Sequence, residues 1–242
     1  MTYTIPKELT YQCCEMPSGG ETVLIVAAGN ATRMQGVDKI VAPLRGLPVI
    51  VRTMMAFERH LGIGRIVVVT REDLCAEISR LADRYMITKF SDVVKGSDTR
   101  AKSVRNGLTV MDGEETLLIH DGARPLVSAA LIDRLLEQPL CDGCIPVVPI
   151  HDTVKRVTDT TVRQTLCRDE LVAVQTPQRV RLSSYRQALE QLSSDASITD
   201  DAAVLEQAGM TVNTVAGDCM NLKITTPADL VLARYYLEVS DL

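Results

Sequence analysis

Short aliphatic runs alternate with segments of helical periodicity along most of this chain, and this alternation constrains its fold more than any other feature. The runs expected to form strands are residues 23–27, 65–70, 87–90, 116–120, 143–148, 211–215 and 221–224. Several of them are apolar throughout, as in strands that are covered on both faces. Helical patterns occupy residues 48–60, 73–85, 100–110, 129–137, 182–192, 200–207 and 228–238. This order predicts an α/β fold, with a Rossmann-like, mostly parallel sheet and helices on both faces.

One region, at about residues 150–175, departs from the alternation. Its sequence, IHDTVKRVTDTTVRQTLCRDELVAVQ, is rich in Thr and Val and alternates polar with apolar residues. It predicts two extended strands that leave the main sheet as a protruding β-hairpin arm. Such an arm has too little core to be stable alone, so we expect it to pack against a second copy in a homodimer. Residues 1–20 are expected to be a frayed extension, and residues 21–242 a single domain.

Composition excludes several classes of protein. The net charge of −5 argues against a general nucleic-acid binder, which needs a basic face. The apolar runs are too short to cross a membrane, and the N-terminus lacks the pattern of a secretory signal. Seven irregularly placed cysteines indicate reduced thiols and a cytoplasmic protein. The lone CxxC pair, Cys141 and Cys144, is interpreted as two small residues beside a turn rather than as a zinc site.

Polar residues gather just beyond the expected strands, where ligands bind in open α/β sheets. They are Ala28, Gly29, Asn30, Ala31, Thr32 and Arg33 after the first strand, Gly96, Ser97, Asp98 and Ser103 after the third, Asp121 and Arg124 after the fourth, Asp152 and Thr153 after the fifth, and Lys223 in the last. Exposed backbone N–H groups and cations bind phosphate. An Asp at a strand end can hold Mg2+, which usually arrives with a substrate's phosphates.

The first turn matches no standard nucleotide motif. It lacks the P-loop pattern, and Ala31 replaces the second glycine of GxGxxG, which disfavours an NAD site. His120 ends a strand, so we interpret it as packed or hydrogen-bonded rather than as a base. On this segment alone, an ordinary strand-to-helix turn with surface cations remains open. With Asp121, Arg124 and Lys223 at the same edge, a phosphate site is the better interpretation.

Seven motifs carry a resemblance to a known family. The stretch AAGNATRM…DKIVAPLRGLPVI resembles the signature of sugar-type nucleotidyltransferases. RAKSVRNGL, HDGARPLV, PIHDTVKR, QTPQ, ITDDAAVLE and NLKITTPADL follow in the order and spacing of the 2-C-methyl-D-erythritol 4-phosphate cytidylyltransferase family. The resemblance runs from about Thr22 to Leu237. Ribitol-5-phosphate cytidylyltransferases share the first motif, but HDGARP and DTVKR look more like the methylerythritol family.

The resemblance implies transfer of CMP from CTP to 2-C-methyl-D-erythritol 4-phosphate, with release of pyrophosphate, in non-mevalonate isoprenoid biosynthesis. The residues that it implies for catalysis are Arg33, Lys39, Arg168 and Lys223; for nucleotide binding Ala27, Ala28, Gly29, Asn30, Gly96, Ser97, Asp98, Ser103 and Asp121; and for the second substrate Thr153, Arg168, Lys223, Arg124, Thr176 and Thr199. Asp121 would face Mg2+ or another divalent cation. The arm of each subunit would bring Thr153 and Arg168 to the site of the other subunit.

Four positions depart from the family pattern, and two other functions stay open. Ala31 replaces a glycine, Asp38 a proline, Ser97 a glycine and Met220 an aspartate. Asp38 adds a carboxylate beside the expected phosphate site, which could weaken nucleotide binding or help to hold a metal. The alternatives are a cytidylyltransferase for ribitol 5-phosphate or another polyol phosphate, and an inactive nucleotide-binding module.

Overall fold

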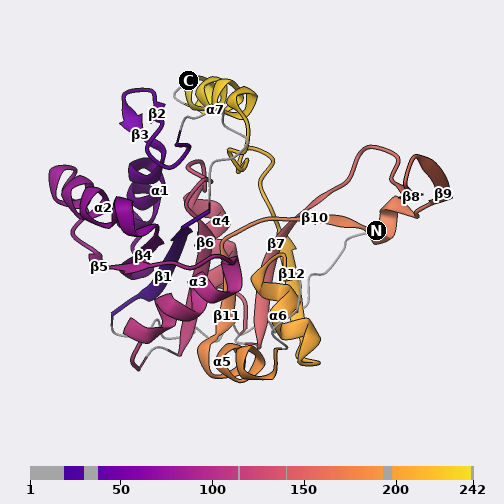
Figure 1. The fold of residues 1–242 in the computed structure, drawn as a ribbon, viewed down its shortest axis with the longest axis horizontal. Coiled ribbons are helices and arrows are strands. Elements are labelled where there is room, and N and C mark those ends of the chain that lie inside the picture. The colour runs from indigo at the N-terminus through magenta and orange to yellow at the C-terminus, as the bar shows by residue number, and fades with distance from the viewer. Residues whose placement is uncertain (1–18, 30–37, 114, 140, 193–197, 241–242) are drawn as a thin grey trace, which may run out of the picture.

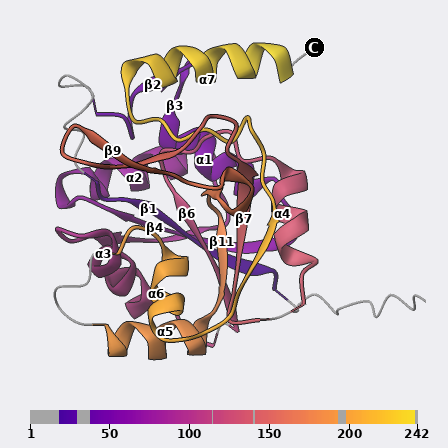
Figure 2. The same ribbon diagram turned by 90° about the vertical axis from the view of Figure 1, so that its right-hand side faces the viewer.

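The computed structural model describes residues 19–29, 38–113, 115–139, 141–192 and 198–240, and within them an eight-stranded sheet lies between helices (Figures 1 and 2). Four parallel strands form one half of it: β5 (Phe90–Lys95), β4 (Ile63–Thr70), β1 (Glu21–Ala27) and β6 (Thr116–Asp121). The antiparallel strand β11 (Gln178–Arg181) joins β6 to β7 (Gly143–Pro149). β12 (Val212–Ala216) pairs with β7 in parallel, and β10 (Val172–Val174) pairs with β7 antiparallel. The expected mostly parallel α/β sheet is therefore confirmed.

Side chains alternate across the sheet and bury one apolar core on each face. Along β1, Val23 and Ile25 pack in a core with helices α1 (Val49–Glu58), α2 (Glu72–Arg84) and α4 (Ala129–Leu136). Leu24 packs on the opposite face with α3 (Arg100–Gly107), α5 (Leu182–Gln191) and α6 (Asp201–Gln207). A 3-10 turn, η1 (Leu108–Val110), continues α3. The two aliphatic cores explain why the expected strands are apolar on both faces.

The C-terminal helix and a small hairpin form a third, smaller cluster. Helix α7 (Pro227–Ser240) buries Ala233 against Leu44 and Val49, beside the short strands β2 (Pro43–Leu44) and β3 (Leu47–Pro48). Within the described parts of the chain, no helix is long and apolar enough to cross a membrane.

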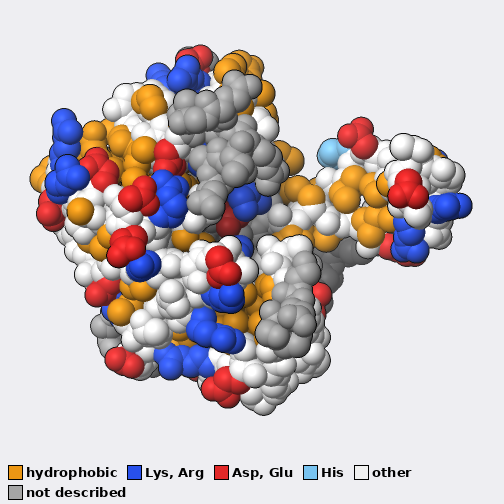
Figure 3. All heavy atoms as spheres, in the orientation of Figure 1, with side chains coloured by type: hydrophobic (Ala, Val, Ile, Leu, Met, Phe, Trp, Pro, Cys, Tyr) orange, Lys and Arg blue, Asp and Glu red, His pale blue; other side chains and the backbone are white. Residues whose placement is uncertain are grey.

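The predicted arm is present as a two-stranded hairpin that projects away from the sheet (Figure 1) and stands out from the body of the molecule in the space-filling view (Figure 3). Strands β8 (Lys155–Thr158) and β9 (Thr161–Thr165) are exposed along their whole length, and the turn η2 (Arg168–Glu170) follows them. Val157 and Val162 face each other across the hairpin and are both more than half exposed. The arm leaves the sheet at the end of β7 and returns to it as β10.

Two of the expected strands were wrong, and four observed strands were not predicted. Residues 87–89 form a turn in which the Phe90 amide donates to the Ile87 carbonyl, so the strand begins only at Phe90. Residues 221–224 lie outside any strand. The Asn221 amide donates to the nearby Asp218 carbonyl, and the Ile224 amide donates to the Ala123 carbonyl in the loop after β6. The short strands β2 and β3 were not predicted, nor were β10 and β11, which return from the arm.

Candidate active site

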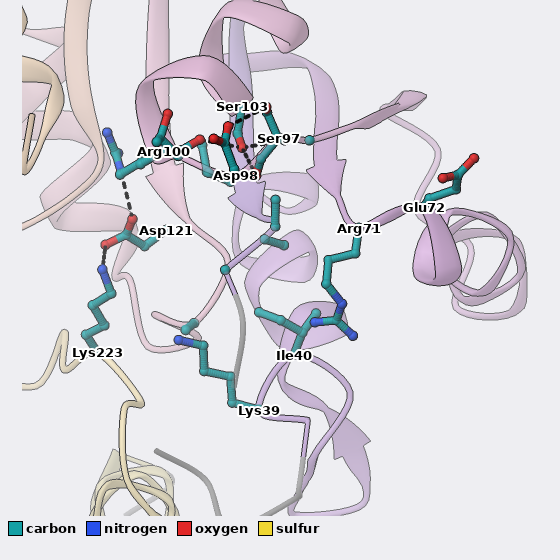
Figure 4. A pocket seen from close by; sticks show the side chains of 17 residues that line it. Lys39, Ile40, Arg71, Glu72, Ser97, Asp98, Arg100, Ser103, Asp121 and Lys223 are labelled. Carbon is teal, nitrogen blue, oxygen red and sulfur yellow. Dashed lines mark hydrogen bonds and ion pairs between the residues drawn. The ribbon is translucent and has the colours of Figure 1, made fainter. Parts of the chain in front are cut away.

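The carboxyl ends of β1, β4, β5 and β6 open onto a cavity of about 410 Å³, which we call the strand-end cavity (Figure 4). All of the described residues expected to bind nucleotide line it. They are Ala27, Ala28, Gly29, Gly96, Ser97, Asp98, Ser103 and Asp121, together with the cations Lys39 and Lys223. Arg33, Asn30 and Ala31 lie outside the described residues. The structure thus brings loops that are distant in sequence to one edge of the sheet, as expected for open α/β folds.

The loop after β5 is held in place by Ser103 and by a close approach to β1. The buried Ser103 hydroxyl donates to the Thr99 carbonyl at 2.8 Å and accepts the Ser97 amide at 2.9 Å. A Cβ atom added to Gly96 would stand only 2.4 Å from the Cβ of Ala28, so this position requires glycine. The loops after β1 and β5 therefore form one rigid wall of the cavity.

Asp38, which departs from the family pattern, is engaged by a cation. Its carboxylate accepts the Ile40 amide at 2.9 Å and forms an ion pair with Arg71. Arg71, at the end of β4, was not predicted as a site residue, yet it lines the same cavity (Figure 4). Because Arg71 offsets the charge of Asp38, the extra carboxylate does not leave an uncompensated anion beside Lys39.

Three cations surround the carboxylate of Asp121, at the end of β6. The Lys223 ammonium lies 2.8 Å from its Oδ2, the Arg124 Nε lies 3.6 Å from the same oxygen, and the Arg100 Nε lies 3.5 Å from Oδ1. Burial alone would raise the pKa of this carboxyl, but the three cations outweigh it and hold the pKa well below its usual range. Asp121 is therefore ionised and fixed in place.

Arg100, in contrast, was not predicted as a site residue. Its side chain is mostly buried, which disfavours its charge, but Asp201 and Asp121 keep its pKa above the ordinary arginine value. Its position at the head of RAKSVRNGL, directly after a ligand-binding loop, was the available signal. Asp201, its closest partner, came from the ITDDAAVLE motif and gave no signal of this contact.

His120 is packed and hydrogen-bonded, as predicted. It is fully buried, and its Nε2 lies 3.0 Å from the Arg124 carbonyl while its Nδ1 lies 3.0 Å from the Thr176 hydroxyl. Because a carbonyl only accepts, Nε2 carries the proton and Nδ1 accepts. Burial lowers the pKa of His120 to about 4, so the ring is neutral near pH 7. Thr176 in turn accepts the Asp121 amide at 3.1 Å, which makes it a support for that residue.

A second cavity, of about 430 Å³, lies beside the first. The predicted second-substrate residues Arg124, Thr176, Thr199 and Lys223 line it, as do Arg100 and Asp121. Arg100, Asp121 and Lys223 line both cavities and are called here the shared wall. A group bound in either cavity therefore meets the same cluster of charges.

The first turn of α7 helps to position Lys223. The Thr226 amide donates to the Asp229 carboxylate at 2.8 Å, and the Asp229 amide reaches back to the Thr226 hydroxyl at 3.4 Å. This reciprocal cap fixes the first turn of α7 directly after the Lys223 segment. The Ile224 amide, bonded to the Ala123 carbonyl at 2.8 Å, anchors the same segment to the loop after β6.

Two predicted site residues are not brought to these cavities within one chain. Thr153 and Arg168 belong to the exposed arm region and line neither cavity. The Arg168 guanidinium donates instead to the His151 carbonyl at 2.8 Å, which ties the two ends of the hairpin together.

Residues 22–239 match the family model described as 2-C-methyl-D-erythritol 4-phosphate cytidylyltransferase. A protein of that name from Bacillus licheniformis is 40% identical over 219 residues, which span 89% of this chain and 95% of the relative. The namesake from Geobacillus kaustophilus is 40% identical over 217 residues, or 88% and 95% of the two chains. The crystal structure of 4-diphosphocytidyl-2C-methyl-D-erythritol synthase from Anaerococcus prevotii is 28% identical, covers 91% of this chain and 99% of its own, and superposes with a TM-score of 0.78.

Proposed function

Since the chain belongs to the 2-C-methyl-D-erythritol 4-phosphate cytidylyltransferase family, it is a cytidylyltransferase, and we propose that its strand-end cavity binds CTP. The enzyme transfers CMP from CTP to 2-C-methyl-D-erythritol 4-phosphate in isoprenoid biosynthesis. A phosphate oxygen of the second substrate attacks the α-phosphorus of CTP, and the bond to the leaving pyrophosphate breaks. The products are 4-diphosphocytidyl-2-C-methyl-D-erythritol and pyrophosphate.

The shared wall is the observation that carries the assignment of the site. The attacking phosphate is already anionic near pH 7, so the reaction needs no general base, and the neutral, buried His120 agrees with this. The reaction needs alignment of two mutually repelling anions and stabilisation of the charge that develops on the leaving pyrophosphate. Arg100 and Lys223, held on Asp121, stand where the two cavities meet.

We assign the nucleotide to the first cavity by the groups that line it. Ala27, Ala28 and Gly29 place backbone against the triphosphate, and the loop from Gly96 to Asp98 receives the cytosine. Lys39 reaches the same cavity from the segment after β1 and would stabilise charge at the α-phosphate and on the pyrophosphate. Arg33 and Asn30 remain predictions for this role. Ser103 acts at least by holding the loop, through its bonds to Thr99 and Ser97.

The described residues fit a divalent cation only if the phosphates of CTP supply part of its ligands. Among the described residues there is no group of three or more His, Cys, Asp or Glu side chains able to enclose a metal. Asp121 offers one ionised carboxylate that already faces three cations. Mg2+ commonly binds through one or two carboxylates plus substrate phosphates, which suits this donor set. When bound there with CTP, it would neutralise phosphate charge.

We place the second substrate in the second cavity. Arg124, Thr176, Thr199 and Lys223 supply cationic and hydroxyl groups for a sugar-alcohol phosphate. Thr153 and Arg168 would complete this site from the arm of a second subunit, which makes the proposed active enzyme a homodimer. The exposed arm, whose two strands bury no side chain, supports this role. Residues 21–242 then form one nucleotidyltransferase domain with the arm as its appendage. A cytoplasmic enzyme agrees with the five cysteines described as free thiols.

Pyrophosphate release tests the substrate assignment. The purified enzyme is assayed with CTP and Mg2+ and with either methylerythritol phosphate or ribitol 5-phosphate. We expect turnover with methylerythritol phosphate. Turnover with ribitol phosphate alone would overturn the choice of substrate, and CTP binding without turnover on either would support an inactive module.

Mixed dimers test the composite site. Lys39→Ala and Arg168→Ala variants, each inactive alone, are mixed after mild dissociation and reassociation. Recovery of about a quarter to half of the wild-type activity would show that the two residues act in one site built from two chains. No recovery in verified mixed dimers would place both residues in the same chain's site.

A further inference from the structure

Behind the shared wall lies a buried chain of polar contacts that the reaction as described so far does not use. Arg100 Nη2 donates to Asp201 Oδ2 at 2.6 Å, and the Tyr185 hydroxyl donates to Asp201 Oδ1 at 2.6 Å. The Asp201 side chain is 1% exposed and Tyr185 is fully buried, so neither can touch a substrate. The chain links α5 and α6 to the end of β6.

Asp201 lies at the start of α6, where several hydrogen bonds hold it in place. Its backbone amide and that of Ala202 both donate to the Gln178 side-chain oxygen, at 2.9 and 3.0 Å. Gln178 also donates to Asp200, whose side chain caps α6 by accepting the Ala203 amide. The carboxylate of Asp201 is thus held by β11, α5 and α6 together, and it cannot follow Arg100 if Arg100 moves.

The distances show how Arg100 divides its interaction between two carboxylates. It lies 2.6 Å from Asp201 but 3.5 Å from Asp121, so Asp201 is its principal partner. Lys223, at 2.8 Å, is the closest cation to Asp121. Among the described residues, Asp121 is the other carboxylate paired with Arg100, so without Asp201 the mostly buried guanidinium would close on Asp121, since an unpaired buried charge is costly. Arg100 and Lys223 would then compete for one carboxylate.

We propose that Asp201 is a positioning residue for the transfer step: by holding Arg100 it reserves Asp121 for Lys223 and so fixes the Lys223 ammonium at the wall between the two substrates. Tyr185 supports Asp201 in this role. The inference rests on the proposed function, because it gives Lys223 a place in the transfer. It assigns no contact between Asp201 and substrate, and the effect reaches the reacting phosphates only through Arg100, Asp121 and Lys223.

The test is a double-mutant cycle between Asp201 and Lys223, read as steady-state pyrophosphate release by the full-length enzyme with CTP, Mg2+ and methylerythritol phosphate. Asp201→Asn keeps the shape of the side chain but removes its charge. We expect kcat to fall about tenfold while the KM for CTP stays within about twofold, since small misplacements at a reacting centre can cost up to about 100-fold. In the Lys223→Ala background the same change is expected to lower kcat less than twofold, because the group that it positions is already absent. Asp201→Glu should restore part of kcat.

Asp142→Asn is the matched control. Asp142 also joins α5 to a neighbouring segment, through Ser184 at 2.7 Å and the Thr211 amide at 3.2 Å. However, it directly precedes β7, at the end of the sheet that faces away from the strand-end cavity. It should lower thermal stability without changing kcat. Tyr185→Phe, which removes only the hydroxyl, serves if Asp201→Asn does not fold, with an expected two- to fivefold loss of kcat that also vanishes in the Lys223→Ala background.

The outcomes separate this inference from the proposed function. An unchanged kcat in folded Asp201→Asn, or an equal loss in both backgrounds, would overturn the positioning role while leaving the active site in place. Wild-type kcat in Lys223→Ala would instead overturn the assignment of the shared wall.

Discussion

Replacing Gly96 with alanine tests whether the close packing of the loops after β1 and β5 shapes the nucleotide cavity. The new methyl group would stand 2.4 Å from the Ala28 Cβ, 3.1 Å from the Ser103 hydroxyl and 3.3 Å from Val69. Ordinary contact begins near 3.4 Å, so the two methyl groups have to separate by about 1 Å. Val69 and Ser103 are buried and cannot retreat, which leaves the turn at Ala28 to move.

The two costs of this substitution are measurable separately. Overpacking of this kind destabilises proteins by about 1–3 kcal/mol. A displacement of about 1 Å in a substrate-binding turn can cost on the order of 100-fold in rate. We expect kcat/KM for CTP, measured by pyrophosphate release, to fall by about that factor, while the KM for methylerythritol phosphate changes little. Thermal unfolding measures the stability term.

Gly19→Ala is the control, because a Cβ there meets nothing within 4 Å. It should leave both kinetics and stability unchanged. A Gly96→Ala enzyme that binds and uses CTP like the wild type would refute the argument that these loops form a rigid nucleotide wall.

Three further predictions follow from the site. Lys39→Ala should lower kcat at least tenfold with little change in the KM for methylerythritol phosphate, and an undiminished kcat would remove Lys39 from the mechanism. Lys223→Ala should instead raise that KM as well as lower kcat, which the same assay with varied methylerythritol phosphate measures. His120 has a folded pKa of about 4 against roughly 6.5 unfolded, so its contribution to stability is complete above about pH 6.5 and is lost as the pH falls toward 4. The free energy of unfolding, measured in urea, should fall by about 2 kcal/mol because of this residue between pH 7 and pH 5. In His120→Gln, this part of the pH dependence of the unfolding free energy should be absent. An equal pH dependence in both proteins would contradict a buried, neutral ring.

The grouping of candidate site residues at one edge of the sheet was predictable because similar chemistry follows several strand ends. Ala28, Gly96, Asp121 and Lys223 follow separate strands or loops, yet the rule that parallel strands present their carboxyl ends at one edge brings them together. The hairpin was predictable because alternating Thr and Val with no partner pattern fits strands exposed on both sides. Structure that follows from a local sequence pattern can thus be predicted without knowledge of distant contacts.

Features set by distant partners were not predictable in the same way. Strand β11 reads as a short polar segment, and only its pairing between β6 and β7 makes it a strand. Residues 221–224 have the composition of a strand, but their backbone bonds to Asp218 and Ala123 rather than to a neighbouring strand. Arg100 and Asp201 are 101 positions apart in the sequence, so no local signal marks their contact. Tertiary context decides such positions.

The place of β11 in the sheet has a consequence for biosynthesis. β6 and β7 face each other only through β11, which is made after both of them and after the whole arm. A nascent chain that has emerged as far as β7 therefore carries two apolar strands, each with an unsatisfied edge, in the middle of its future core. Such edges are templates for intermolecular pairing. Ribosome pausing or truncation between residues 150 and 178 should thus yield an aggregation-prone chain that recruits chaperones, whereas a chain released beyond Arg181 can join β6 to β7 through β11.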